Sequence, residues 1–127
     1  MSIDELEVLV RALGLPYQKR GNAILTMYKT ETGEEIGIVI SLEQETESVR
    51  VAAPLDVEPL PQALSWFLEE NFTSTTYKYT IDTEGFITVV YDLPAKCIKT
   101  ARDLREAIVE VIEGAKRVLE RVEKEES

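Results

Sequence analysis

The clearest pattern in the sequence is an apolar stripe along its last quarter. From about Ala101 to Glu125, apolar residues recur three or four positions apart. They are Ala101, Leu104, Ile108, Val111, Ala115, Val118 and Val122, with Ile112 and Leu119 beside them. This spacing predicts one long amphipathic helix whose apolar side is broad enough to cover a protein core. Thr100 and Asp103 fit the capping pair that begins such a helix.

This helix is longer than the core of a small domain requires. About 25 residues that rise roughly 1.5 Å each extend for about 37 Å. We expect the proximal part of the stripe, Leu104 to Ala115, to lie in the core. The distal residues Val118, Leu119 and Val122 should extend past it and be covered by a second chain. Gly114 interrupts good helix formers at a cost of about 1 kcal/mol, which predicts that another element packs closely against its backbone.

Two shorter helices are expected earlier in the chain. Residues 3–13 follow a capping pair, Ser2 and Glu5, and Gly14 ends this helix. The second helix begins near Pro61, because proline suits the first helical turn. Its apolar residues share one side, which should face the core. They are Leu60, Leu64, Phe67, Leu68 and Phe72.

The remaining segments read as strands separated by turns. They are residues 23–29, 36–42, 49–53, 76–82 and 86–92. Most of the connections between successive strands are short, so the strands should pair antiparallel. The order αβββαββα predicts one α+β domain over residues 1–127. We expect a five-stranded antiparallel sheet, helices packed mainly on one face, and a long C-terminal helix.

The charge and composition of the chain limit the kinds of partner and location that we expect. The chain has 24 acidic and 14 basic residues, for a net charge of −10. This charge argues against binding to nucleic acid or to acidic membranes, and it would attract basic protein segments. The first residues lack the pattern of a signal peptide, and no apolar run is long enough to span a membrane, so we expect a cytoplasmic protein. The absence of histidine and the scarcity of thermolabile residues suggest a thermophilic source.

Little in the sequence indicates catalysis. Without histidine, the commonest general base and metal ligand is missing. Cys97 lies between Lys96 and Lys99, whose charges favour the thiolate, yet a half-buried structural cysteine before a helix is the simpler interpretation. Nucleotide-binding glycine motifs are absent. We therefore predict no catalytic residue, no cofactor and no metal site.

Trp66 is the only tryptophan of the chain and is followed by Phe67. Neighbouring residues on a helix point about 100° apart, so both rings cannot sit in the middle of one narrow face. Phe67 fits the core side, which leaves Trp66 at the core edge or in an interface, where tryptophan is enriched. The predicted protein-interaction residues are therefore Trp66, Val118, Leu119 and Val122.

The order of elements, read over the whole chain, resembles the type III secretion chaperone-like fold, which is shared with the YbjN-like proteins. The resemblance implies a curved antiparallel sheet and frequent homodimers. It also implies apolar patches that hold an extended segment of a client protein, or a regulatory role. No residue motif carries the resemblance, so it transfers no site residue.

We therefore predict a non-enzymatic protein-binding module, chaperone-like or regulatory, that acts as a homodimer. Its partner could carry basic segments. A structural or assembly subunit of a larger complex is one alternative, and an enzyme of unknown reaction is another. A polar, convergent cavity would favour an enzyme, whereas an exposed apolar patch would favour protein binding.

Overall fold

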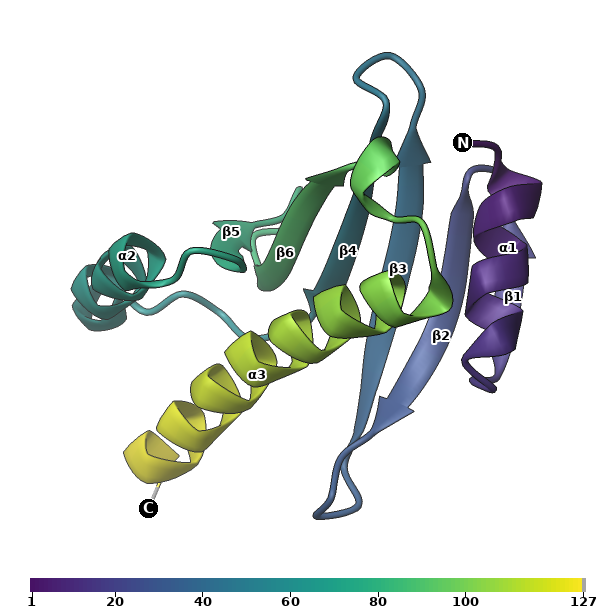
Figure 1. The fold of residues 1–127 in the computed structure, drawn as a ribbon. Helices are drawn as coiled ribbons and strands as arrows, with labels where there is room; N and C mark the ends of the chain where they lie inside the picture. Colours follow the sequence, from purple (N-terminus) through teal and green to yellow (C-terminus); the bar gives the residue numbers. More distant parts are fainter. Residues whose placement is uncertain (127) are drawn as a thin grey trace.

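The computed structural model describes the backbone of residues 1–126 and the side chains of residues 1–122 (Figure 1). Its helices are α1 (Ile3–Ala12), α2 (Leu64–Thr73) and α3 (Ala101–Glu126). Its strands are β1 (Tyr17–Arg20), β2 (Ala23–Lys29), β3 (Glu35–Glu43), β4 (Ser48–Pro54), β5 (Lys78–Ile81) and β6 (Ile87–Pro94). Two short 3₁₀ turns, η1 (Pro61–Ala63) and η2 (Ala95–Cys97), precede α2 and α3. The α+β class and the long C-terminal helix are confirmed.

The sheet has six strands in the order β1-β2-β3-β4-β6-β5, and every pair is antiparallel. The prediction of five strands was wrong, because β1 was missed. Its sequence, Tyr17 to Arg20, is polar after the first residue and shows no apolar alternation. Its position comes instead from pairing with β2 across a two-residue turn, in which Gly21 has a φ of 58°. Such left-handed backbone favours glycine.

The helices lie mainly against one face of the sheet. Figure 1 shows α3 crossing that face, with α1 beside its N-terminal half and α2 beyond the β5 edge. Both α1 and α3 begin at the capping residues that the sequence predicted: the Ser2 hydroxyl accepts from the Glu5 amide, and the Thr100 hydroxyl accepts from the Asp103 amide. Each hydroxyl thereby satisfies one of the backbone N–H groups that the first helical turn leaves unpaired.

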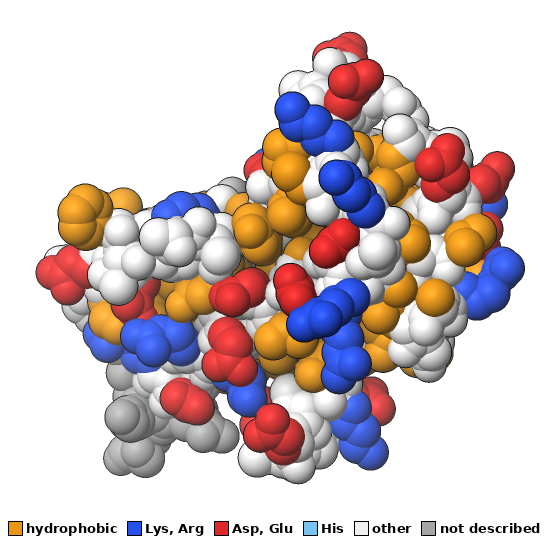
Figure 2. Space-filling view, in the orientation of Figure 1, with side chains coloured by type: hydrophobic (Ala, Val, Ile, Leu, Met, Phe, Trp, Pro, Cys, Tyr) orange, Lys and Arg blue, Asp and Glu red, His pale blue; other side chains and the backbone are white. Residues whose placement is uncertain are grey.

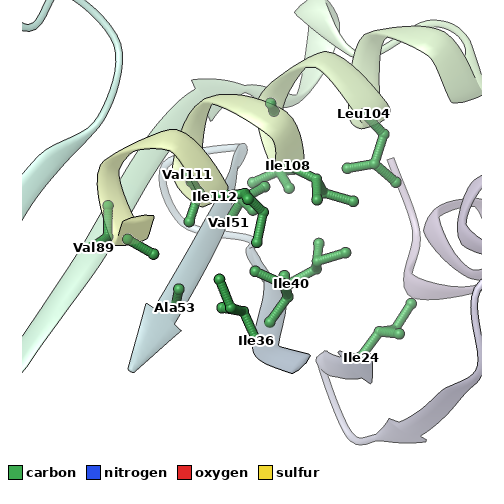
Figure 3. Close-up of a cluster of buried hydrophobic side chains, with 14 of the residues drawn as sticks. Ile24, Ile36, Ile40, Val51, Ala53, Val89, Leu104, Ile108, Val111 and Ile112 are labelled. Atoms are coloured by element: carbon green, nitrogen blue, oxygen red, sulfur yellow. The ribbon is translucent and has the colours of Figure 1, made fainter. Parts of the chain in front are cut away.

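The core lies between α3 and the covered face of the sheet (Figure 3). Alternate residues of β3 are buried, as the period of two requires for a strand with one covered face. The proximal stripe of α3 packs on them, and Leu104, Ile108, Val111 and Ala115 are at most 1% exposed. The prediction that these four residues are core is confirmed.

Gly114 lets α3 approach β5 and β6 closely. A Cβ atom at this position would lie 2.7 Å from the ring of Tyr77 and 2.9 Å from a methyl group of Val89. The Tyr79 hydroxyl also donates a hydrogen bond of 2.8 Å to the Gly114 carbonyl oxygen. The predicted close packing against Gly114 is therefore confirmed.

Candidate protein-interaction surfaces

Helix α2 closes the outer edge of β5. The Asn71 side-chain amide donates to the Tyr79 carbonyl oxygen at 3.1 Å, and the Tyr79 N–H donates to the Asn71 Oδ1 at 2.7 Å. At Tyr79, this one side chain makes the two backbone hydrogen bonds that a neighbouring strand would otherwise make. The Lys78 ammonium donates to the carbonyl oxygens of Asn71 and Ser74, where α2 ends. The β5 edge of the sheet is thus covered at Tyr79, which hinders another strand from pairing there.

A cluster of aromatic rings joins α2, β5 and the distal half of α3. The Phe67 ring centre lies 5.0 Å from that of Trp66 and 5.3 Å from that of Tyr79. The Arg121 guanidinium lies 4.9 Å from the Trp66 ring centre, a distance at which a cation is attracted to the ring face. Burial raises the pKa of the Tyr79 hydroxyl well above its ordinary value, so it stays a hydrogen-bond donor.

An ion pair adds a second link between the same two helices. The Arg117 Nε donates to the Glu70 carboxylate at 2.7 Å. This hydrogen bond also raises the pKa of Arg117. The distal half of α3 is thus fastened to α2 by both apolar and charged contacts.

The apolar side of α2 faces solvent for the most part, contrary to the prediction. Only Phe67 is buried within the helix. Leu64, Leu68 and Phe72 are 43%, 69% and 92% exposed. We call these three residues the α2 stripe. Figure 2 shows apolar side chains at the surface around α2. The sequence pattern showed that these residues share a side of the helix, but it could not show that Trp66, Phe67 and Asn71 turn toward β5 instead.

A groove lies between α2, the distal part of α3 and the connection that precedes α2. We call it the distal groove. It encloses about 460 Å³. Buried side chains form its base, and exposed carboxylates of the connection lie at its rim. Its lining includes Ala63, Phe67, Val118 and Val122 together with Asp56, Glu58 and Arg121.

The four predicted interaction residues lie in different parts of the structure and do not form one surface. Val118 is 1% exposed and belongs to the core of the chain itself, so it does not extend past that core. The reason is that α2 and the connection before it enlarge the core beneath the distal half of α3. Val122 is half-buried in the distal groove. Leu119 lines a separate small depression, and Trp66 lies in the aromatic cluster. Their role in binding stays a prediction.

The structure shows where the residues that could carry chemistry lie. Cys97 is exposed, not half-buried as expected, because η2 carries it at the surface before α3. Within the described part of the chain, no group of three potential metal ligands comes together. None of its helices combines the length and the apolar character that crossing a membrane requires.

Comparison with known proteins identifies the fold. No protein-family model and no curated protein sequence matches the chain. YbjN from E. coli, described as a candidate transcription regulator, superposes with a TM-score of 0.70 at 16% identity, over 98% of this chain and 94% of YbjN. A chain of the HopA1–SchA chaperone–effector complex superposes with a TM-score of 0.60 at 13% identity, over 87% of each chain. The YbjN-like, secretion chaperone-like fold predicted from the order of elements is confirmed.

Proposed function

We propose that this chain is a non-enzymatic protein-binding module that acts in the cytoplasm as a homodimer, with a chaperone-like or regulatory role. The α2 stripe carries the proposal, because a phenylalanine that is 92% exposed beside two exposed leucines is typical of a surface that meets a partner. The fold neighbours support the same class of function. One belongs to a chaperone–effector complex and the other is described as a regulator.

A second copy is the partner that best fits the α2 stripe. Residues 60–76 contain only two charged side chains, Glu69 and Glu70, in a chain that is 30% charged. Glu70 is already paired with Arg117. Two copies with a net charge of −10 each can therefore meet here with little repulsion. Depletion of charge is also the compositional mark of interface cores.

The spacing of the stripe suits helix-on-helix packing. Leu64, Leu68 and Phe72 lie four residues apart, and residues with this spacing form ridges that interlock between two helices at about −50°. A two-fold axis through the middle of α2 would bring the α2 stripe of one copy against the α2 stripe of the other. The proposed dimer is therefore joined by α2 against α2.

Light scattering on the purified protein tests the dimer. The mass should be about twice the 14.4 kDa of the single chain at micromolar concentrations. A Leu68→Asp/Phe72→Asp variant should become monomeric, since the buried charges would oppose association. It should keep its fold, because both side chains are exposed in the single chain.

Val8→Asp is the matched control, because Val8 is 58% exposed on α1, away from α2. This variant should remain dimeric. A parent protein that stays at the mass of one chain would contradict the homodimer. That result would favour the alternative of an assembly subunit, in which a different protein covers the α2 stripe.

A further inference from the structure

We infer that the distal groove binds a segment of a partner protein that carries a large apolar side chain next to Lys or Arg. The inference rests on the proposed protein-binding role but not on the homodimer. It gives Val118 and Val122 a function at the base of this groove.

The base of the groove is apolar and already formed. Phe67 and Val118 are 8% and 1% exposed, and both pack in the core cluster. Ala63 adds a small side chain that leaves room above it. The enclosed volume of about 460 Å³ lies in the range of roughly 300–1,000 Å³ that is usual for ligand clefts. A base supported by the core needs little rearrangement to receive an apolar side chain.

The rim of the groove is acidic on the side of the connection before α2. Asp56 and Glu58 are exposed there. Neither carboxylate forms an ion pair with another of the described residues. On the α3 side, the groove is lined by Arg121, which lies over the Trp66 ring. A bound segment would therefore place its cation toward the connection, and the difference in charge between the two sides would orient it.

The acidic rim is held in place by the sheet. The Leu55 N–H donates to the Ile87 carbonyl oxygen at 3.1 Å, and the Ile87 N–H donates to the Val57 carbonyl oxygen at 2.8 Å. Two residues of the connection thus flank Asp56 and pair with one residue of β6, as in a β-bulge. Asp56 adopts a φ of 55°, in the left-handed region that aspartate tolerates better than most residues. This arrangement fixes the backbone from which the Asp56 carboxylate projects.

Three synthetic peptides test the inference. They share the same Phe and Leu anchors in a Gly/Ser background, and their flanking residues are Lys, Glu or Ser. Anisotropy of the fluorescein-labelled peptides gives the affinity. Emission of Trp66, the only tryptophan, reports the location, because its ring lies against Phe67 and Arg121 of the groove. We expect the Lys peptide to bind roughly tenfold more tightly than the Glu peptide and to change Trp66 emission.

Variants of the protein separate the contribution of the acidic rim to peptide binding from that of the apolar base. Asp56→Asn/Glu58→Gln keeps the shape of both side chains. It should lower the affinity for the Lys peptide roughly five- to tenfold, and the affinity for the Ser peptide should stay within about twofold of that of the parent protein. Val122→Lys should remove binding of all three peptides. Val109→Lys is its matched control, because Val109 is exposed on the same helix and does not line the groove.

Equal affinity for the Lys and Glu peptides would overturn the inference, and so would no binding of any peptide at saturating concentration. Binding that Val122→Lys and Val109→Lys leave equally unchanged would also overturn it. In each case light scattering would still decide the dimer separately. A monomeric parent that binds the Lys peptide in the groove would overturn only the role of the α2 stripe as a dimer interface.

Discussion

At the scale of single residues, Gly114 shows two opposing effects that can be compared in magnitude. Alanine at this position would favour the helix by about 1 kcal/mol. Its methyl group, however, would lie under 3.0 Å from the half-buried Tyr77 and the fully buried Val89. Overpacking of this kind costs about 1–3 kcal/mol. The steric cost should therefore exceed the gain in helix propensity.

We predict that Gly114→Ala lowers the free energy of unfolding by about 1 kcal/mol or more, as measured by urea denaturation. Glu113→Ala is the control, because Glu113 is exposed one position earlier in the same helix. It should change stability by at most about 0.5 kcal/mol. A Gly114→Ala variant that is more stable than the parent would show that the Tyr77 ring moves aside at no cost.

Asn71 is a second residue whose role extends beyond its own helix. Asn71→Ala would remove both hydrogen bonds to the backbone of Tyr79. We predict a loss of about 1–3 kcal/mol in the free energy of unfolding. The Tyr79 amide should also exchange its proton faster in hydrogen-exchange NMR, because its hydrogen-bond acceptor would be gone. Unchanged exchange at Tyr79 would contradict the view that this side chain closes the sheet.

At the scale of elements, the sequence predicted what local periodicity determines. The helix α3 has an apolar side over several turns and a capping pair at its start, and both are found in the structure. Strand β1 was missed because its position depends on pairing with β2. The sequence signal that was overlooked is the Gly21–Asn22 pair, a dipeptide typical of tight hairpins.

The orientation of α2 could not be predicted from its own residues. Its apolar residues share one side, and the usual inference is that such a side faces the core. Here Phe67 is the buried residue of α2, with Trp66 packed beside it, while Asn71 bonds to β5 and Leu68 is left exposed. This outcome depends on a strand that follows α2 in the chain. An apolar side on a short helix at a sheet edge therefore indicates either a core contact or an interface.

At the scale of the whole molecule, the distal groove depends on contacts between segments far apart in the sequence. Asp56 and Val122 line one groove although 65 residues separate them in the chain. The prediction that the end of α3 is involved in binding selected two of the lining residues, Val118 and Val122. It could not include Asp56 and Glu58, because no local pattern connects them with α3.

The proposed dimer places Leu68 near its counterpart in the second copy, because Leu68 lies close to the middle of α2. This position makes Leu68 the residue with which to test the proposed contact of α2 with α2. Cys97 is the only cysteine, and Cys97→Ser should preserve both the fold and the dimer, since the thiol is exposed and bonded to nothing in the core. In the Cys97→Ser protein, a cysteine introduced at a chosen position is then the only thiol that can form a disulfide.

The most direct measurement is therefore the yield of disulfide-linked dimer from Cys97→Ser/Leu68→Cys under mild oxidation, read on a non-reducing gel. Cys97→Ser/Val8→Cys is the control, because Val8 is similarly exposed on α1. If α2 packs on α2 about a two-fold axis, the Leu68→Cys protein should become largely covalent dimer at micromolar concentration while the Val8→Cys protein stays monomeric on the gel. Equal yields from the two proteins would contradict the proposed interface.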